Sequence, residues 1–405
     1  MYNTLAVAMR DAVHTLREKG VPDAMREIRE ALASYGEGAK RGKAEPSAKR
    51  SQTPDRHEPV RSAAHKARSR APSAMRTPLG AVVKALQSSR RGAGAFALRP
   101  GLGGVHAKKP AEAPTIPDGA QFHARSFYCP AGSRDYKLYV SAKAGKKPKG
   151  LVIMLHGCGQ DPDDFAAGTG MNALAEAHGL IVAYPHQTGS ANPSQCWNWF
   201  RPVDQKRDAG EPAIIAGITR EIQTEFDLDR RKIFVAGLSA GGAMAAVMLE
   251  TYPDLYAAAG IHSGLAFGAA RDVMSALAAM RGDHPGGSSE AASRAGADVR
   301  PPVRTIVFHG ESDQTVHPSN AHRIVANASS EFARNPVRRE YQETAAGRSY
   351  SRLVIADPSG SSLVECWLVE AAGHAWSGGD PAGSYTDPCG PDASAEMVRF
   401  FLNKS

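Results

Sequence analysis

The sequence is poor in cysteine and has no long hydrophobic run, and both absences narrow the class of protein. Five cysteines in 405 residues are too few for a disulfide-held scaffold and leave room for one or two local bridges. No stretch approaches ~18 apolar residues, so no membrane-spanning helix is expected. The 40 Gly and 27 Pro follow no triplet period, which excludes a collagen-like fibre. With 42% hydrophobic residues, the chain can bury the core of one large α/β domain or two smaller ones.

Positive charge is concentrated in the N-terminal part of the chain. Residues 1–115 hold 22 Lys and Arg against 10 Asp and Glu, whereas the remaining residues hold 27 basic and 31 acidic ones. The overall charge of +8 therefore belongs to an N-terminal arm and not to the rest of the chain. A basic arm can contact an anionic surface such as lipid or another polyanion, or it can be a solvated extension. We favour the solvated extension and expect no specific nucleic-acid partner.

The first 120 residues predict two segments without a packed core. Apolar residues recur at helical spacing over residues 4–34, which predicts an amphipathic helical segment at 1–35 that docks on the body or forms a dimer contact. The chain start lacks the pattern of a secretory signal. Residues 36–120 are rich in Ala, Ser, Arg, Lys, Pro and Gly and predict a disordered basic linker, with one short helix at 79–86.

Residues 121–405 have the pattern of one α/β domain. Alternating residues at 125–128 and 136–140 predict a β-hairpin at a sheet edge. Beyond them, apolar runs predict strands at 151–155, 180–184, 232–236, 257–261, 303–308 and 363–369. Helical patterns occur at 171–178, 213–226, 240–250 and 394–402, and residues 282–302 form a polar loop. This alternation predicts a mostly parallel central sheet with helices on both faces.

The strongest chemical signal is Gly237-Leu238-Ser239-Ala240-Gly241, which lies between a predicted strand and a predicted helix. Small residues around Ser239 permit the tight strand-to-helix turn that exposes a serine hydroxyl above a sheet. The N-terminus of the following helix favours negative charge that develops there. Ser239 is therefore the candidate nucleophile.

Two more predicted strand ends supply partners for this serine. Asp313 follows the strand at 303–308, and a carboxylate there can hold an imidazole in the correct tautomer. Glu311 competes for this role, but Asp313 lies further into the loop. His374 follows the last predicted strand and can reach back over the sheet as the base. The chain order Ser, Asp, His is that of an α/β-hydrolase.

Acyl transfer through such a serine also needs donors for the oxyanion of the tetrahedral intermediate. The strand at 151–155 ends in His156-Gly157-Cys158-Gly159-Gln160, whose backbone amides can supply them together with the amide of Ala240. No cofactor is expected. A metal site is not expected either, because His309, His317 and His322 lack the spacing of metal ligands.

From about Phe127 to Leu402 the sequence resembles the poly(3-hydroxybutyrate) depolymerase family of esterases, in particular the catalytic domain of extracellular-type short-chain-length polyhydroxyalkanoate depolymerases. The matching stretches are Met154-Leu-His-Gly-Cys-Gly-Gln160, Cys196-Trp-Asn-Trp-Phe200, Gly210-Glu-Pro212, Gly237-Leu-Ser-Ala-Gly-Gly-Ala243, His262-Ser-Gly264, Phe308-His-Gly310 and Gly373-His-Ala-Trp-Ser-Gly-Gly379. The resemblance implies Ser239 as nucleophile, Asp313 as orienting acid and His374 as base. It also implies that the backbone amides of Cys158 and Ala240 form the oxyanion hole.

The resemblance implies an α/β-hydrolase fold and a serine esterase that hydrolyses poly(3-hydroxybutyrate) or its oligomers through an acyl-enzyme. Relatives that act on feruloyl and acetyl esters of plant polysaccharides provide the alternative substrate class. A polymer- or granule-binding protein that uses its basic arm is the non-enzyme alternative, and the intact Ser239, Asp313 and His374 argue against it.

Two further implications concern cysteines and location. The family often pairs the cysteines that correspond here to Cys158 and Cys196, and Cys366 with Cys389 is a weaker second pair. Such a bridge and the family's frequent secretion favour the extracellular region, whereas the missing signal pattern favours the cytoplasm.

Aromatic residues beside the catalytic motifs are candidate walls of the substrate site. Trp197, Trp199 and Trp376 occur in loops next to these motifs, and aromatic faces there can pack against polyester methyl groups or a phenolic ring. Gln160 is a further substrate-binding candidate in the first loop. For Trp199, core packing under the loop is an equal alternative.

Overall fold

The computed structural model describes residues 116–403 except 146, 284–302, 331 and 333–335. The expected helical segment 1–35, the linker up to residue 115 and most of the loop 282–302 therefore lie outside the described residues. Within the described part, no helix is both long and apolar enough to cross a membrane.

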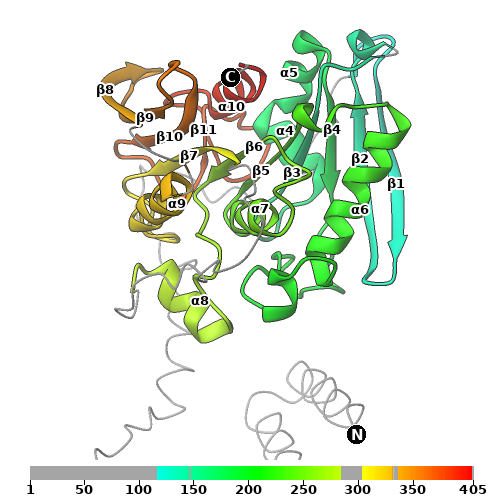
Figure 1. Cartoon of the computed structure of the whole chain (residues 1–405), viewed down its shortest axis with the longest axis horizontal. Coiled ribbons are helices and arrows are strands. Elements are labelled where there is room, and N and C mark those ends of the chain that lie inside the picture. Colours follow the sequence, from blue (N-terminus) through cyan, green and yellow to red (C-terminus); the bar gives the residue numbers. More distant parts are fainter. Residues whose placement is uncertain (1–115, 146, 284–302, 331, 333–335, 404–405) are drawn as a thin grey trace, which may run out of the picture. The chain divides into compact units, whose positions relative to one another are not determined.

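Ten strands form one sheet in the order β1-β2-β4-β3-β5-β6-β7-β10-β9-β8, with β8 and β1 at its two edges (Figure 1). Their bounds are β1 Gln121–Cys129, β2 Gly132–Val140, β3 Leu151–Leu155, β4 Ile181–Pro185, β5 Ile233–Leu238, β6 Ala258–His262, β7 Arg304–Gly310, β8 Val337–Ala345, β9 Arg348–Ala356 and β10 Ser362–Val369. Neighbours from β4 to β10 pair in parallel, which confirms the expected mostly parallel centre. The short strands β11 (Trp376–Ser377) and β12 (Thr386–Asp387) pair separately.

Helices cover both faces of the sheet, as expected. The α-helices are α4 (Pro162–Thr169), α5 (Met171–His178), α6 (Gly210–Glu225), α7 (Ala240–Thr251), α8 (Val273–Met280), α9 (Ser319–Ser330) and α10 (Ala393–Leu402), with short 3-10 turns at Ala142–Ala144, Pro202–Gln205 and Arg230–Lys232. One hydrophobic core joins the sheet to α6, α7, α8 and α9. A second core joins the opposite face to α4, α5 and α10. Successive residues of β3 enter the two cores alternately, because side chains alternate along a strand.

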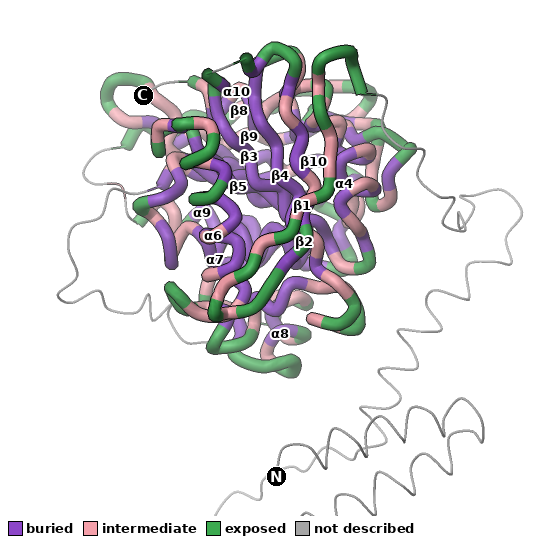
Figure 2. The backbone as a smooth tube through the Cα atoms, turned by 90° about the vertical axis from the view of Figure 1, so that its right-hand side faces the viewer, coloured by how far each residue is buried: buried purple, intermediate pink, exposed green. Residues whose placement is uncertain are grey.

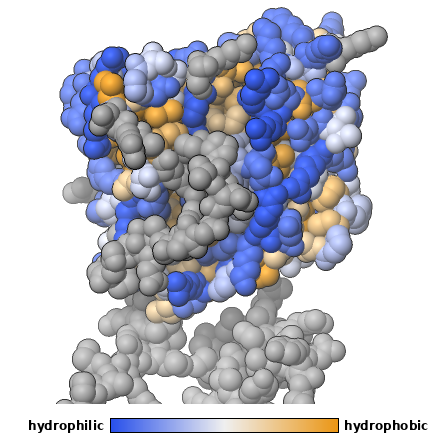
Figure 3. Space-filling model, viewed as in Figure 1, coloured by the Kyte–Doolittle hydropathy of each residue, from blue (hydrophilic) through white to orange (hydrophobic). Residues whose placement is uncertain are grey.

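Burial follows this layering. The central strands are buried and lie between partly exposed helices (Figure 2). The face drawn in Figure 3 is largely hydrophilic, with hydrophobic residues in small patches. The burial of the central strands explains why their sequences are continuous apolar runs instead of alternating ones.

The hairpins at the two edges of the sheet differ in how well the sequence indicates them. The hairpin of β1 and β2 is confirmed, and β2 continues antiparallel onto β4. The antiparallel β8–β9 hairpin, which extends the sheet beyond β10, was not expected. The reason is that β8 is mostly exposed and carries Arg338, Arg339 and Glu340, so it has no apolar face to reveal it. Charged residues on an edge strand also oppose pairing with another chain.

Candidate active site

The candidate residues come together because they all follow carboxyl ends of parallel strands. The loop at 156–160 follows β3, and Ser239 follows β5. Asp313 follows β7, and His374 follows β10. Carboxyl ends of parallel strands lie at one edge of a sheet, where ligands of open α/β sheets usually bind.

Ser239 occupies a strained turn between β5 and α7. Its φ of 57° and ψ of −118° are rare for a residue other than glycine. Its amide donates to the carbonyl of His262 at 2.9 Å, so neighbouring strands hold the turn. A Cβ at Gly241 would lie 1.9 Å from the carbonyl oxygen of Leu155. The glycine is therefore required for α7 to pack this close to β3.

Asp313 and His374 form a direct contact. The Nδ1–H of His374 donates to Oδ2 of Asp313 at 2.7 Å. The other carboxylate oxygen accepts from the amides of Thr315 at 2.8 Å and Val316 at 2.9 Å. Burial alone would raise the pKa of Asp313, but hydrogen bonds from His309 and His374 outweigh it and hold that pKa well below its usual range. A carboxylate that stays ionised can fix the imidazole tautomer and stabilise an imidazolium.

Neither the competing acid Glu311 nor Ser239 is hydrogen-bonded to His374 in the described structure. Glu311 is exposed, and its backbone amide is bound to the carbonyl of Val369. No hydrogen bond joins Ser239 to His374 within residues that the structure describes. Such bonds are often long in enzymes without substrate and shorten in the complex.

In the loop at 156–160, two of the three central amides are already bound inside the protein. The amide of Gly157 donates to Oε1 of Gln160 at 2.9 Å, and the amide of Gln160 donates to the Gly157 carbonyl. Gly159 donates to the carbonyl of Ser194 at 3.1 Å. Of the three central amides, Cys158 is then the candidate donor. The amide of Ala240 is the first of α7, and the first amides of a helix have no partner inside it.

A disulfide joins Cys158 to Cys196, the pair that the resemblance implies, with Cα atoms 4.3 Å apart. The expected bridge between Cys366 and Cys389 is wrong, because both thiols are free. Cys366 lies inside β10, where burial raises its pKa to about 12. A buried thiol with a raised pKa is unreactive.

Three of the four expected substrate contacts are instead structural. Trp197 is fully buried and donates from Nε1 to the carbonyl of His156 at 3.1 Å. Trp376 is also buried, and its Nε1 donates to Oγ of Ser394 at 3.0 Å. Gln160 is 1% exposed, and its amide group donates to the carbonyl of Ser384 at 2.9 Å. The expectation is wrong for these three, because buried groups with internal partners present no surface to substrate. Trp199, at 6% exposure, stays a prediction.

Two buried histidines support the site but were not among the predicted residues. His156 donates from Nδ1 to the carbonyl of Gly157 at 2.8 Å and accepts from the amide of Gln187 at 3.0 Å. His262 accepts from the amide of Ser377 at 3.0 Å and stacks on Trp376 with ring centroids 5.0 Å apart. His156 follows β3 and His262 is the last residue of β6, and both lie within the quoted motifs, which is the signal that could have revealed them. Each ring nitrogen that accepts a hydrogen bond requires a neutral imidazole.

The two histidines predict a loss of stability in mild acid. Burial lowers the pKa of His156 from 6.5 to about 4 and that of His262 from 6.5 to about 3. From pH 6.5 down to about 4, the unfolded chain therefore binds protons that the folded chain does not. The free energy of unfolding should fall over this window by about 1.4 kcal/mol per pH unit for each histidine. Burial raises the pKa values of Asp204 and Glu211, which opposes part of this fall.

Denaturant unfolding at several pH values between 6 and 5 measures this slope. His262→Gln keeps an acceptor for the amide of Ser377 and removes the titration, so it should reduce the slope by about 1.4 kcal/mol per pH unit. A slope that is unchanged in this variant would contradict the assignment.

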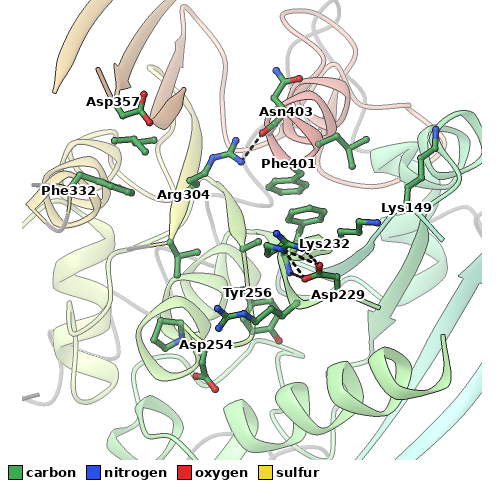
Figure 4. Close-up of a pocket in the computed structure, with 18 residues that line it drawn as sticks. Lys149, Asp229, Lys232, Asp254, Tyr256, Arg304, Phe332, Asp357, Phe401 and Asn403 are labelled. Carbon is green, nitrogen blue, oxygen red and sulfur yellow. Dashed lines mark hydrogen bonds and ion pairs between the residues drawn. The ribbon is translucent and has the colours of Figure 1, made fainter. Parts of the chain in front are cut away.

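A cavity of about 1010 Å³ lies elsewhere in the fold (Figure 4). Its walls include Phe234, Tyr256, Arg304 and Phe401, which lie near the amino ends of β5, β6 and β7 and on α10. This is the edge of the sheet opposite Ser239. Size alone therefore does not identify the candidate site. Within the described residues, no group of three or more His, Cys, Asp or Glu side chains could hold a metal ion.

Comparisons with known proteins agree with this architecture. The solved acetyl xylan esterase from Aspergillus awamori is similar with a TM-score of 0.53 and 21% identity, covering 69% of this chain and 98% of that chain. This similarity supports the α/β-hydrolase fold. Poly(3-hydroxyalkanoate) depolymerase C of Paucimonas lemoignei is 31% identical over 231 residues, which are 55% of this chain and 54% of that protein. Feruloyl esterase B of Neurospora crassa is 29% identical over 251 residues, which are 58% of this chain and 81% of that protein.

The family assignment follows from a match to a described protein family. This chain spans about half the length of the depolymerase. The family described as esterase PHB depolymerase matches residues 134–336, which is half of the chain and includes Ser239 and Asp313. By this match and by the strand-end geometry of its site, the chain belongs to the PHB depolymerase family of esterases.

Proposed function

We propose that this protein is a serine carboxylic ester hydrolase whose substrate is poly(3-hydroxybutyrate) or its oligomers. The observation that carries the proposal is the 2.7 Å contact between His374 and Asp313, at the sheet edge where the turn at Ser239 lies. This arrangement fits acyl transfer, because it supplies a nucleophile, a base and an ionised acid that orients the base.

The proposed reaction has two halves. In the first, His374 takes the proton of Ser239 while the serine oxygen attacks the ester carbonyl. The amides of Cys158 and Ala240 stabilise the oxyanion, and the imidazolium then protonates the leaving alcohol, which departs and leaves an acyl-enzyme. In the second half, His374 deprotonates water, which attacks the acyl group, and the proton returns to Ser239 as the acid leaves.

The substrate class rests on the relatives. A poly(3-hydroxyalkanoate) depolymerase is among them at 31% identity, which supports a polyester substrate. The alternative is an ester of a plant polysaccharide. A specific observation favours it, because the similarity to the Neurospora feruloyl esterase extends over 81% of that protein.

Product analysis on two substrates separates these alternatives. The purified protein and its Ser239→Ala variant are incubated with amorphous poly(3-hydroxybutyrate) and with feruloylated or acetylated xylan. Serine-dependent release of 3-hydroxybutyrate or its oligomers is the expected result. Release of ferulate or acetate alone would move the protein to the carbohydrate esterases with the same mechanism. No product from either substrate would leave a hydrolase of small esters or a polymer- or granule-binding protein.

We also propose that residues 121–405 form the catalytic domain and that the basic arm contacts an anionic surface or remains solvated. Deletion of residues 1–115 should then change kcat/KM for a soluble aryl ester by no more than about twofold. Steady-state kinetics of the full and shortened chains measure this. A large loss in a shortened chain with an unchanged circular dichroism spectrum would make the arm part of the site.

A further inference from the structure

A buried carboxylate that the proposed mechanism does not use lies behind the oxyanion loop. Glu211, at the start of α6, is 5% exposed. Its carboxylate accepts from the backbone amide of Asn198 at 2.7 Å, from Nδ2 of Asn198 at 2.7 Å and from Nε2 of Gln187 at 2.6 Å. A buried carboxylate costs stability unless several donors compensate it. Three donors from the connection between β4 and the 3-10 turn at Pro202–Gln205 indicate a built site for this side chain.

Both of these partners connect to the segment that carries Cys196. Nε2 of Gln187 also donates to the carbonyl of Cys196 at 2.9 Å. The backbone amide of Gln187 donates to Nε2 of His156 at 3.0 Å. Asn198 is two residues beyond Cys196 in the same segment. Glu211 is therefore hydrogen-bonded to segment 194–198 directly through Asn198 and indirectly through Gln187.

Segment 194–198 is in turn attached to the oxyanion loop at three points. These are the disulfide between Cys158 and Cys196, the bond from the amide of Gly159 to the carbonyl of Ser194, and the bond from Trp197 to the carbonyl of His156. A displacement of segment 194–198 would therefore move Cys158 with it.

The other side of Glu211 is fixed as well. Its backbone amide donates to Oδ1 of Asp204 at 2.8 Å. A Cβ at Gly210, whose φ is 53°, would lie 2.2 Å from that same oxygen. Nη2 of Arg134 lies 3.6 Å from the carboxylate of Glu211, and its guanidinium lies 5.8 Å from the centre of the Trp197 ring. These contacts fix the position of Glu211 at the start of α6.

We propose that Glu211 is a positioning residue that holds the amide of Cys158 where the oxyanion of the tetrahedral intermediate forms. This inference rests on the proposed function and adds a residue to its machinery. Groups that orient a reacting site without touching substrate commonly contribute about 10- to 100-fold. Both halves of the reaction pass through an oxyanion, so the loss should fall on kcat and not on KM.

Glu211→Gln and a matched control test the proposal. The variant keeps the size of the side chain, but it has one acceptor oxygen and an NH₂ group that faces donors. We expect kcat for a soluble aryl ester to fall about 10- to 100-fold with KM within about twofold. Affinity for a trifluoromethyl ketone, whose adduct with serine is an oxyanion, should weaken by a similar factor.

The control is Glu365→Gln on β10. Glu365 is 1% exposed and accepts from Arg399 at 2.6 Å, so the variant also removes a buried carboxylate. Its hydrogen-bond partners, Arg399 and Trp367, lie outside segment 194–198. It should lower thermal stability and leave kcat and ketone affinity within about twofold of wild type. Equal kcat losses in the two variants would overturn the proposal, as would an unchanged kcat in Glu211→Gln.

Hydrogen–deuterium exchange provides a readout that needs no activity. Amides of segments 156–160 and 194–198 should exchange faster in Glu211→Gln than in wild type or Glu365→Gln, and unchanged exchange would overturn the proposal. A wild-type protein that hydrolyses no ester would refute the proposed function, while the exchange data would still decide whether Glu211 holds the loops.

A milder variant covers the case in which Glu211→Gln does not fold. Gln187→Ala removes one donor to Glu211 together with the bond from the same Nε2 to the carbonyl of Cys196, and it leaves Glu211 bound to Asn198. A kcat loss with unchanged KM and faster exchange of segment 194–198 would support the proposal. Unchanged kcat and exchange would overturn it.

Discussion

Replacing Ser239 with alanine should lower kcat for ester hydrolysis by roughly 10⁵- to 10⁶-fold, the loss expected when a nucleophilic serine is removed. The fold should stay intact, because backbone bonds hold the turn. The amide of residue 239 donates to the carbonyl of His262, and its carbonyl accepts from the amide of Ala243. Alanine keeps the Cβ, so the unusual φ of 57° carries no additional strain.

The measurement combines an aryl-ester assay with labelling by a fluorophosphonate, which reacts with an activated serine. Ser263→Ala is a matched control, because Ser263 is also buried, follows β6 and has a positive φ of 47°. The control should keep its labelling and most of its activity. Activity above about 1% of wild type in Ser239→Ala would sink the nucleophile assignment.

Replacing Asp313 with asparagine should lower kcat by about 10⁴-fold with little change of structure. An asparagine oxygen can still accept from the amides of Thr315 and Val316, which hold the present carboxylate. Its NH₂ group would then face Nδ1 of His374 in place of the oxygen at 2.7 Å. That favours the tautomer with the proton on Nε2, which cannot accept the proton of Ser239.

Glu311→Gln serves as the control for this experiment, because Glu311 is exposed and lies two residues away. It should leave kcat within about twofold of wild type. A large loss of kcat in Glu311→Gln with a small one in Asp313→Asn would show that Glu311, and not Asp313, orients His374.

The strands and the candidate triad could be predicted because their signals are local. Strands β3 to β7 are buried on both faces, so each consists mainly of apolar residues, and β3, β5, β6 and β7 have a glycine at or close to their ends. Ser239 directly follows β5, and Asp313 and His374 lie a few residues beyond the ends of β7 and β10. The helices α4 and α8 are not among the predicted ones, although both have local start signals in the sequence. Asp161 caps α4 and Pro162 is its first residue, while Asp272 and Ser275 form a capping box at the start of α8.

Other features depend on contacts between distant segments. Trp376 is buried because Phe165 from α4 and His262 from β6 pack on its ring, with centroids 5.5 Å and 5.0 Å away. Nothing within a few residues of Trp376 indicates those neighbours. The contact between Glu211 and Asn198 in segment 194–198 is equally non-local, although Gly210-Glu-Pro212 is one of the stretches that carry the family resemblance.

The pairing of β10 with β7 also determines when the site can form during folding. These strands pair in parallel although α9 and the β8–β9 hairpin separate them in the chain. Asp313 and His374 therefore meet only after this long connection has closed, a slow event because distant segments must be brought together before their contacts stabilise them. An intermediate that has assembled β3 to β7 would contain Ser239 in its turn and still be unable to turn over an ester. Recovery of esterase activity consequently reports the fraction of chains that have completed folding, a quantity that secondary-structure signals overestimate.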